Sequence, residues 1–360
     1  MEPARVLIVD DSRVFRAALE SALAGLPDLV VAGSVFSGQK ALDFLQTAHV
    51  DLVTLDVEMP GMDGLETLAA LRQWNLAQPA ERQVGVVMVS AFTQRGADVT
   101  VQALGAGAFD FVAKPSAASP EEAIAQLRLD LVPKLRAFLH RRRPGGSVAP
   151  AAPLKAPPTT TKSEPSVRPR KLRGIAVASS TGGPPALAEL LPGLGQIVAP
   201  VFIVQHMPPT FTRSLAANLA RRINREVIEA LDGDLVQTSR VYIAPGGKHL
   251  ALRRDAAGRL MTVCTEQPPE GGCRPSANVL FRTASAALGS DLAAIVLTGM
   301  GNDGTAGLGS VRRAGGIVIA QDESSSVVWG MPRSAVEAGL ADLVLPLGEI
   351  SAAVRAAALP

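Results

Sequence analysis

Short apolar runs that alternate with helix-length segments constrain the fold of this 360-residue chain more than any other feature. Runs such as RVLIVD, VDLVTLD and VGVVMVS occur before residue 140, and runs such as GIAVAS, VFIVQH and LAAIVLTG occur after residue 173. Most of them lack a polar face, as strands covered on both faces of a sheet do, and the intervening segments are long enough for helices. This alternation predicts the α/β class, with two doubly wound parallel sheets.

The segment 140–172 has a different composition from the rest of the chain. Proline, alanine, serine, threonine and basic residues dominate it, and it holds almost nothing that could fill a core. Such segments are typical of flexible linkers. We therefore predict two domains, residues 1–139 and 173–360, joined by this linker. Its basic residues are typical of a solvated tether, although they could also dock an acidic partner.

Composition, cysteine usage and sequence motifs argue against a secreted, a membrane-spanning or a nucleic-acid-binding protein. A hydrophobic fraction of 47% and a charged fraction of 19% are those of a soluble globular protein, and the net charge is only +2. The cysteines, Cys264 and Cys273, form neither a metal motif nor a disulfide framework, which fits a reducing compartment. We find no signal peptide, no membrane-length apolar run and no basic recognition helix. We therefore expect a cytoplasmic protein with no nucleic-acid partner and no direct membrane insertion.

Chemically active side chains follow the apolar runs of the N-terminal half. Asp10 and Asp11 follow the first run, Asp56 ends the third, Ser90 the fourth, and Lys114 follows the fifth. Because the carboxyl ends of parallel strands meet at one edge of a sheet, these side chains should form one pocket. Its carboxylates suit Mg²⁺, and a lysine with a hydroxyl could hold a phosphoryl group carried by Asp56. Each residue alone could instead be a cap or a turn residue, but a whole set at strand ends is poorly explained in that way.

Residues 4 to about 135 resemble a response-regulator receiver domain, through the motifs LIVDDS, LDVEMPGMDG, VSAF and FVAKP. The resemblance implies a flavodoxin-like fold, phosphorylation of Asp56 by a histidine kinase, and Mg²⁺ as the cofactor of phosphorylation. The ligands of Mg²⁺ that it implies are Asp10, Asp11, Asp56 and the backbone of Glu58. Ser90 and Phe111 would be the switch residues that report phosphorylation, and Lys114 would contact the phosphoryl group.

Three strand ends of the C-terminal half carry a hydroxyl, an imidazole and a carboxylate. VASSTGG supplies a serine, VFIVQHMPP contains His206, and AIVLTGMGNDG reaches Asp303 through a glycine-rich loop. This set predicts nucleophilic acyl transfer, with His206 as the base and Asp303 fixing its tautomer. Gly182 and Gly183 permit a sharp turn, so N–H groups at a helix start could stabilise an oxyanion. Plainer interpretations exist for each piece: SSTGG as an N-cap, His206 as a packing residue and GNDG as a turn.

Residues 174 to about 357 resemble the catalytic domain of the CheB family of chemotaxis protein-glutamate methylesterases. The motifs that carry the resemblance are SSTGGPPAL, QHMPPTFTRSLA, YIAPGGKHL, CRPSANVLF, TGMGNDGTAGL and AQDESSSVVWGMPRSA. It implies a Rossmann-like α/β domain that hydrolyses glutamate methyl esters on chemoreceptors and deamidates specific glutamines, with no cofactor for the ester step. The nucleophile of the family stands before Thr-Gly-Gly and is therefore Ser180, whereas Ser179 stands where alanine is usual. Four further residues match positions near the substrate or the oxyanion: Thr181, Gly182, His249 and Met300.

The order of the two domains suggests how the esterase is controlled. The receiver-like domain would cover the catalytic cleft and move away when a kinase of the chemotaxis type phosphorylates Asp56, which a flexible linker permits. Because His206 must be neutral to accept a proton, activity should fall on acidification through its pKa, about 6.5 if unperturbed. Two alternatives stay open: a response-regulated serine hydrolase or deamidase with a non-receptor substrate, and a catalytically silent adaptor that binds receptors.

Overall fold

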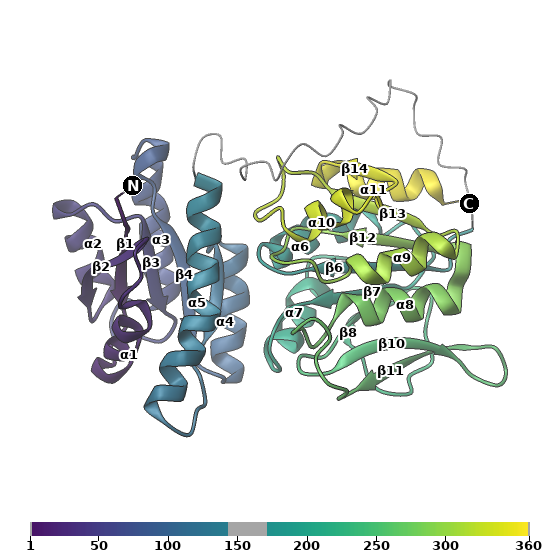
Figure 1. Ribbon diagram of the computed structural model, residues 1–360, viewed down its shortest axis with the longest axis horizontal. Coiled ribbons are helices and arrows are strands. Elements are labelled where there is room, and N and C mark those ends of the chain that lie inside the picture. The colour runs from purple at the N-terminus through teal and green to yellow at the C-terminus, as the bar shows by residue number, and fades with distance from the viewer. Residues whose placement is uncertain (1, 143–170, 359–360) are drawn as a thin grey trace.

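The computed structural model describes residues 2–142 and 171–358, which fold into two α/β domains (Figure 1). Most of the predicted linker, residues 143–170, lies outside the described residues, so its flexibility stays a prediction. The last helix of the N-terminal domain ends at Arg142, and residues 140–142 are therefore helical. On the other side of the gap, Leu172 is already buried in the C-terminal domain.

The N-terminal domain is a five-stranded parallel sheet in the order β2-β1-β3-β4-β5, with helices on both faces. Its elements in chain order are β1 (Ala4–Val9), α1 (Arg13–Leu23), β2 (Leu29–Val35), α2 (Gly38–Thr47), β3 (Leu52–Asp56), α3 (Gly64–Leu76), β4 (Gly85–Ser90), α4 (Gln94–Gly105), β5 (Asp110–Ala113) and α5 (Pro120–Arg142). Along β1, Val6 and Ile8 join the apolar cluster with α1 and α5, while Leu7 and Val9 join the cluster with α2, α3 and α4. This alternation explains why the runs lack a polar face, and it confirms the predicted doubly wound sheet.

Helix capping in this domain comes from residues other than those of the acidic pocket. The side chains of Ser12 and Thr93 cap α1 and α4, accepting from the N–H groups of Phe15 and Gly96. Asp63 caps α3 and forms a capping box with Glu66. The helices that follow β1, β3 and β4 therefore do not use Asp10, Asp56 or Ser90 as caps. Asp10 does act locally as a turn residue, because its Oδ1 accepts from the Ser12 N–H at 2.8 Å.

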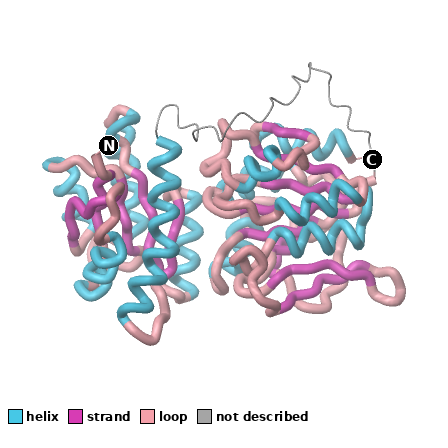
Figure 2. Tube along the Cα trace, viewed as in Figure 1, coloured by secondary structure: helices cyan, strands magenta, loops and turns pink. Residues whose placement is uncertain are grey.

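The C-terminal domain contains a seven-stranded parallel sheet in the order β14-β13-β12-β6-β7-β9-β8 and an antiparallel hairpin, β10-β11. Its strands are β6 (Gly174–Ser179), β7 (Val201–Gln205), β8 (Val227–Glu229), β9 (Val241–Ile243), β10 (His249–Arg254), β11 (Leu260–Thr265), β12 (Leu292–Val296), β13 (Ile317–Gln321) and β14 (Leu343–Leu345). Its helices are α6 (Gly183–Gly193), α7 (Phe211–Ala220), α8 (Ala277–Leu288), α9 (Thr305–Arg313), α10 (Met331–Glu337) and α11 (Leu347–Ala357). The hairpin extends along the edge of the domain below α8 (Figure 2).

The sheet of the C-terminal domain is covered on both faces. Helices α6, α7 and α11 pack on one face, and α8, α9, α10 and the hairpin pack on the other. The sequence predicts six of the seven strands, and it misses β8 and the hairpin. β8 has only three residues, and β10 ends in two exposed arginines, Arg253 and Arg254, so neither carries a strong apolar signal.

The two domains meet through helix α4, strand β5 and the loop that follows β4 of the N-terminal domain. Helix α4 packs against α7 and α6 of the C-terminal domain, as Figure 1 shows at the centre of the molecule. Buried residues on both sides belong to one continuous apolar cluster, which includes Val101 and Leu104 of α4 and Leu215 of α7. Across this boundary, the Gln94 side chain donates to the Ser214 hydroxyl at 2.9 Å. Within the described ranges, no helix is long and apolar enough to cross a membrane.

Candidate active site and phosphorylation site

The acidic pocket predicted for the N-terminal domain forms at the carboxyl ends of β1 and β3. Asp10 follows β1, Asp56 ends β3, and Nζ of Lys114 lies 2.9 Å from Oδ2 of each carboxylate. Asp10 and Asp56 are buried, whereas Asp11 and Glu58 are exposed. β1 and β3 are the neighbouring strands at which the chain order of the sheet reverses, which is the usual place for a ligand in such folds.

The electrostatics of this pocket favour a bound cation. Burial raises the pKa of the Asp56 carboxyl to about 6; hydrogen bonding to Lys114 opposes the rise, and the charge of Asp10 adds to it. Burial alone would lower the pKa of Lys114, but its bonds to Asp10 and Asp56 raise it overall. Oxygen atoms of Asp10, Asp11 and Asp56 lie within 4.8 Å of one another. An all-oxygen donor set with one exposed side suits Mg²⁺, so the residues present fit the ion that the sequence implies.

The predicted switch residues, Ser90 and Phe111, are both buried. The Ser90 hydroxyl donates to the carbonyl of Ala91 at 3.4 Å. Phe111 stacks on Phe211 of α7, with ring centroids 4.6 Å apart and planes inclined by 25°. Phe92 packs edge-on against the same ring at 5.9 Å. Phe111, the predicted switch residue of one domain, is therefore in direct contact with the other domain.

Ser180 follows β6, where the chain order of the seven-stranded sheet reverses between β12 and β7. Its N–H donates to the carbonyl of Thr298 at 3.0 Å, which continues the pairing of β6 with β12 beyond the strands. Gly182 has a φ of 78° and begins α6 without a side-chain cap. A Cβ at Gly183 would lie 2.0 Å from Oε1 of Gln205. Backbone geometry and close packing therefore require both glycines, and SSTGG is not a side-chain N-cap.

The neighbouring Ser179 has a different environment. It is fully buried, and its hydroxyl donates to Oε1 of Gln205 at 2.7 Å. Nε2 of Gln205 in turn donates to the carbonyl of Ser180 at 3.0 Å. Ser179 and Gln205 are register partners on β6 and β7, which explains their contact. Because the Ser179 hydroxyl points into the protein, the partly exposed Ser180 is the better placed of the two for attack.

His206 follows β7, and its Nε2 lies 2.8 Å from Oδ2 of Asp303. Nε2 therefore carries the proton that bonds Asp303, and Nδ1 is left to accept another. Burial lowers the pKa of His206, but the bonds to Asp303 and to the nearby Cys273 thiol raise it overall, to about 9. The pKa of His206 is therefore higher than the unperturbed value of about 6.5 that the sequence analysis used, because Asp303 and Cys273 stabilise the imidazolium.

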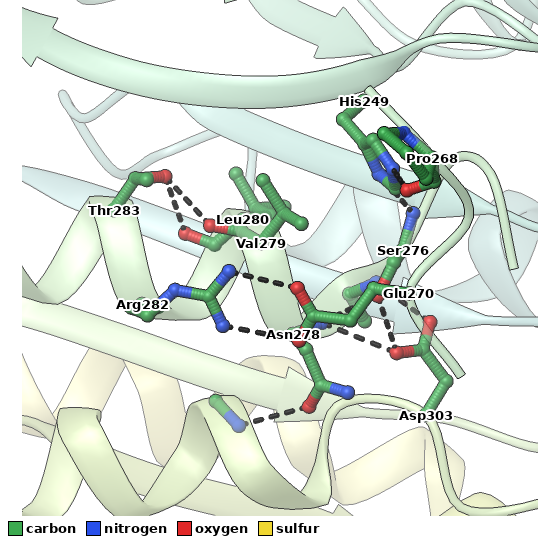
Figure 3. A network of polar contacts seen from close by, with 12 residues as sticks. His249, Pro268, Glu270, Ser276, Asn278, Val279, Leu280, Arg282, Thr283 and Asp303 are labelled. Atoms are coloured by element: carbon green, nitrogen blue, oxygen red, sulfur yellow. Dashed lines mark hydrogen bonds and ion pairs between the residues drawn. The ribbon is translucent and has the colours of Figure 1, made fainter. Parts of the chain in front are cut away.

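Asp303 is held by hydrogen-bond donors at the starts of two helices, as Figure 3 shows for the donors from α8. Its Oδ1 accepts from the Ser276 hydroxyl at 2.7 Å and from the Gly304 N–H at 2.9 Å. Its Oδ2 accepts from the Ala277 N–H at 2.7 Å. Burial would raise the pKa of Asp303, but the bond to His206 and these donors lower it overall. The carboxylate is therefore ionised and fixed in orientation.

His249 contacts Ser276, the residue whose hydroxyl bonds Asp303 (Figure 3). Its Nδ1 accepts from the Ser276 N–H at 3.2 Å, and its Nε2 donates to the Pro268 carbonyl at 3.1 Å. The side chain is almost fully buried. His249, predicted to lie near the substrate, is therefore placed to position Ser276, and through Ser276 the carboxylate of Asp303.

The other residues predicted near the substrate lie around Ser180. A Cβ on Gly299 would lie 2.8 Å from that of Ser180, so the loop that carries the partly exposed Met300 runs beside the serine. The Thr181 side chain is buried and faces the N-terminal domain, where its hydroxyl donates to Oδ2 of Asp110 at 2.5 Å.

Three residues that contact the predicted site residues are missing from the sequence-based prediction: Cys273, Gln205 and Asp110. Cys273 has its sulfur within 4.8 Å of the donor atoms of both His206 and Asp303. Its signal in the sequence is its place at the start of the motif CRPSANVLF. Gln205 and Asp110 directly precede the predicted residues His206 and Phe111, but adjacency alone does not show what their side chains contact.

A cleft of about 1050 Å³ lies between the two domains and reaches the active site. His206, Cys273 and Arg274 line it from the C-terminal domain, and Phe111 and Glu122 line it from the N-terminal domain. The N-terminal domain therefore forms one wall of the space that leads to His206.

Comparisons with known proteins agree with this arrangement. Residues 175–354 match the CheB methylesterase family, and residues 6–127 match the response regulator receiver domain. A protein-glutamate methylesterase/protein-glutamine glutaminase from a Nocardioides species is 44% identical over 350 residues, which cover 96% of this chain and 93% of that protein. A protein of the same name from Nitrobacter hamburgensis is 40% identical over 360 residues, with coverages of 97% and 93%. The crystal structure of the Thermotoga maritima CheB methylesterase catalytic domain is 40% identical and has a TM-score of 0.50, covering 51% of this chain and 98% of that one. The chain therefore belongs to the CheB methylesterase family and carries a response-regulator receiver domain ahead of its methylesterase domain.

Proposed function

We propose that the enzyme hydrolyses glutamate methyl esters on chemoreceptors, and deamidates glutamines there, through Ser180, His206 and Asp303. The observation that carries this proposal is the 2.8 Å contact of His206 with Asp303, at the edge of the sheet where Ser180 follows β6, the strand between β12 and β7. Esters and amides share the same acyl chemistry, so one triad can serve both reactions. Relatives that match nearly the whole chain carry both activities in their name.

In the proposed reaction, Oγ of Ser180 attacks the carbonyl carbon and passes its proton to Nδ1 of His206. Asp303 stabilises the imidazolium that results. His206 then gives this proton to the departing methanol or ammonia as the bond to the carbonyl carbon breaks. Water, activated by the same imidazole, hydrolyses the acyl-enzyme and restores Ser180.

The oxyanion of the tetrahedral intermediate would form beside Thr181 and Gly182, at the start of α6, and beside the loop of Met300. Backbone N–H groups at a helix start offer partial positive charge to an anion. This step uses a base, a nucleophile and hydrogen-bond donors that all belong to the protein, so it needs no cofactor.

Control of the reaction is proposed to reside in residues 1–139, which act on the catalytic domain of residues 173–360 through the linker 140–172. A histidine kinase would phosphorylate Asp56. Mg²⁺ would be held by Asp10, Asp11, Asp56 and the backbone of Glu58, and when bound it would offset the negative charge of the phosphoryl group. Lys114 would hold a phosphoryl oxygen. A kinase and a chemoreceptor as partners also suit the cytoplasmic location expected from the sequence.

The receiver is proposed to restrain the esterase in the unphosphorylated state. Two contacts support this regulation: the stacking of Phe111 on Phe211, and the hydrogen bond from Thr181 to Asp110. Phosphorylation of Asp56 would rearrange Ser90 and Phe111, loosen these contacts and open the cleft that leads to His206.

The proposal is tested by methanol release from methylated chemoreceptor membranes. We expect Ser180→Ala to abolish release, Ser179→Ala to retain it, and a small-molecule phosphodonor with Mg²⁺ to stimulate the wild type. Unchanged release in Ser180→Ala would exclude Ser180 as the nucleophile. Hydrolysis of methylated non-receptor proteins at the same rate would favour a general serine hydrolase, and receptor binding without any release would favour an adaptor.

A further inference from the structure

Cys273 belongs to a cluster of metal-ligand side chains that the ester chemistry does not explain. One donor atom each of His206, Cys273 and Asp303 lies within 4.8 Å of the other two. The three residues come from different segments: the end of β7, the loop before α8 and the loop after β12. The proposed hydrolysis uses His206 and Asp303 but assigns no role to a thiol.

The surrounding structure holds Cys273 in place. Its N–H and carbonyl pair with the carbonyl and N–H of Glu270, both at 3.1 Å. Glu270 is held by Arg282 of α8 through two contacts, at 3.0 and 2.8 Å, which Figure 3 shows. The next residue, Arg274, donates to the carbonyl of Glu266 at 3.1 Å. The sulfur is therefore presented to His206 by a fixed loop, as in a preorganised ligand.

The cluster is also accessible from solvent. Cys273 and His206 are partly exposed, and both line the cleft between the domains. An ion in the cleft can reach the sulfur and the imidazole without passing through the core. Asp303 lies behind them and is fixed by its donors from α8 and α9.

We propose that Cys273, His206 and Asp303 form a binding site for Zn²⁺, and that Zn²⁺ bound there inhibits the esterase. Thiolate, imidazole and carboxylate are the three ligand types that Zn²⁺ prefers, and three protein ligands leave a fourth position for water. The spacing is compatible with one central ion, since Zn–ligand bonds of about 2.0–2.3 Å separate two ligands by less than about 4.6 Å. The oxygen-only pocket at Asp56 has the opposite preference, for a hard cation such as Mg²⁺.

Inhibition follows from the tautomer of His206 and rests on the function proposed above. Without Zn²⁺, Nε2 carries the proton that bonds Asp303, and Nδ1 has a lone pair for the proton of Ser180. When Nε2 ligates Zn²⁺, the neutral imidazole carries its proton on Nδ1. That nitrogen then has no lone pair to accept the serine proton, and the base is lost.

The binding site is tested with Co²⁺ as a spectroscopic probe of the full-length chain, with excess Mg²⁺ present to occupy the receiver. We expect the wild type to develop a thiolate-to-Co²⁺ absorption band with one equivalent of Co²⁺, and Zn²⁺ to displace it. Cys273→Ser and Cys273→Ala should lose the band. Cys264→Ser is the matched control and should keep it, because Cys264 lies on β11, where its thiol faces the carbonyl of Ala230 at 3.5 Å. A band that survives in the Cys273 variants, or no band in the folded wild type, overturns the site.

Inhibition is tested by methanol release from phosphodonor-stimulated protein, with each variant compared with its own metal-free rate. Zn²⁺ should inhibit the wild type and Cys264→Ser, and a chelator should reverse the inhibition. The Zn²⁺ concentration for half-inhibition should rise in Cys273→Ser by more than the ~10–100-fold typical of losing a group that only supports a ligand. An unchanged concentration overturns the inference. Absence of methanol release from the metal-free wild type would instead refute the proposed function, while the Co²⁺ band would still report on the site.

Discussion

The hydroxyl of Thr181 donates a 2.5 Å hydrogen bond to Oδ2 of Asp110 across the boundary between the two domains. Thr181 directly follows the proposed nucleophile, Ser180, and Asp110 directly precedes the proposed switch residue, Phe111. Lys134 lies 2.8 Å from the same carboxylate oxygen and lends it a positive charge. One buried hydrogen bond therefore joins the segment of the proposed nucleophile to the segment of the proposed phosphorylation switch.

Asp110→Ala is expected to raise methanol release by the unphosphorylated chain. A hydrogen bond to a charged group contributes about 1.5–3 kcal/mol, so its loss should shift the closed–open equilibrium by roughly tenfold or more. The measurement is the ratio of rates with and without phosphodonor, which should shrink. Asp43→Ala, an exposed acidic position on α2, is the matched control. A folded Asp110→Ala protein with the wild-type basal rate would show that this bond does not restrain the enzyme.

Ser276→Ala should lower kcat with little change in KM, because Ser276 acts on Asp303 and not on the substrate. The lost bond, 2.7 Å from hydroxyl to carboxylate, predicts a decrease of roughly 10–100-fold. The change also removes the N-cap of α8 and should cost about 0.5–2 kcal/mol in the free energy of unfolding. Ser276→Thr keeps the hydroxyl and should restore most of kcat. An equal loss in Ser276→Thr would point to packing as the cause.

The pH profile of kcat/KM should follow the deprotonation of His206. Burial lowers the pKa of His206, but Asp303 and Cys273 together raise it to about 9, so the rate should increase with pH up to about that value and then level off. In Asp303→Asn the imidazolium loses its charged partner while burial remains. The midpoint should therefore move to lower pH, at a reduced maximal rate. The assay uses chelator-treated protein, and a rate that stays constant far below the predicted midpoint contradicts His206 as the base.

Removal of Mg²⁺ should abolish stimulation by the phosphodonor. The oxygen atoms of Asp10, Asp11 and Asp56 lie within 4.8 Å of one another, and their mutual repulsion opposes the approach of a phosphoryl group. The rates with and without phosphodonor should become equal in a chelator, and added Mg²⁺ should restore the difference. Asp56→Asn should lose stimulation even with Mg²⁺ present. Stimulation that persists in the chelator would mean that the pocket does not need the ion.

The sequence predicts much of the site because parallel sheets bring strand ends together. Ser180, His206 and Asp303 are distant in the chain, yet each follows an apolar run, and this is enough to place them on one edge. The same rule gathers Asp10, Asp56 and Lys114. Periodicity fails for β8 and for the hairpin β10-β11, whose short or partly exposed strands have no continuous apolar run.

Local pattern by itself therefore determined the fold class, the positions of most strands and the side chains at their ends. Only the tertiary structure decided which side chains touch: Cys273 beside His206, Ser179 against Gln205, and Thr181 on Asp110, which lies 71 residues earlier in the chain. The raised pKa of His206 belongs to this second group. The physical reason is the distance along the chain over which each kind of information acts. Apolar runs encode burial over a few residues, whereas hydrogen bonds and charge pairs depend on ångström distances that exist only after separate segments, and here separate domains, have packed together.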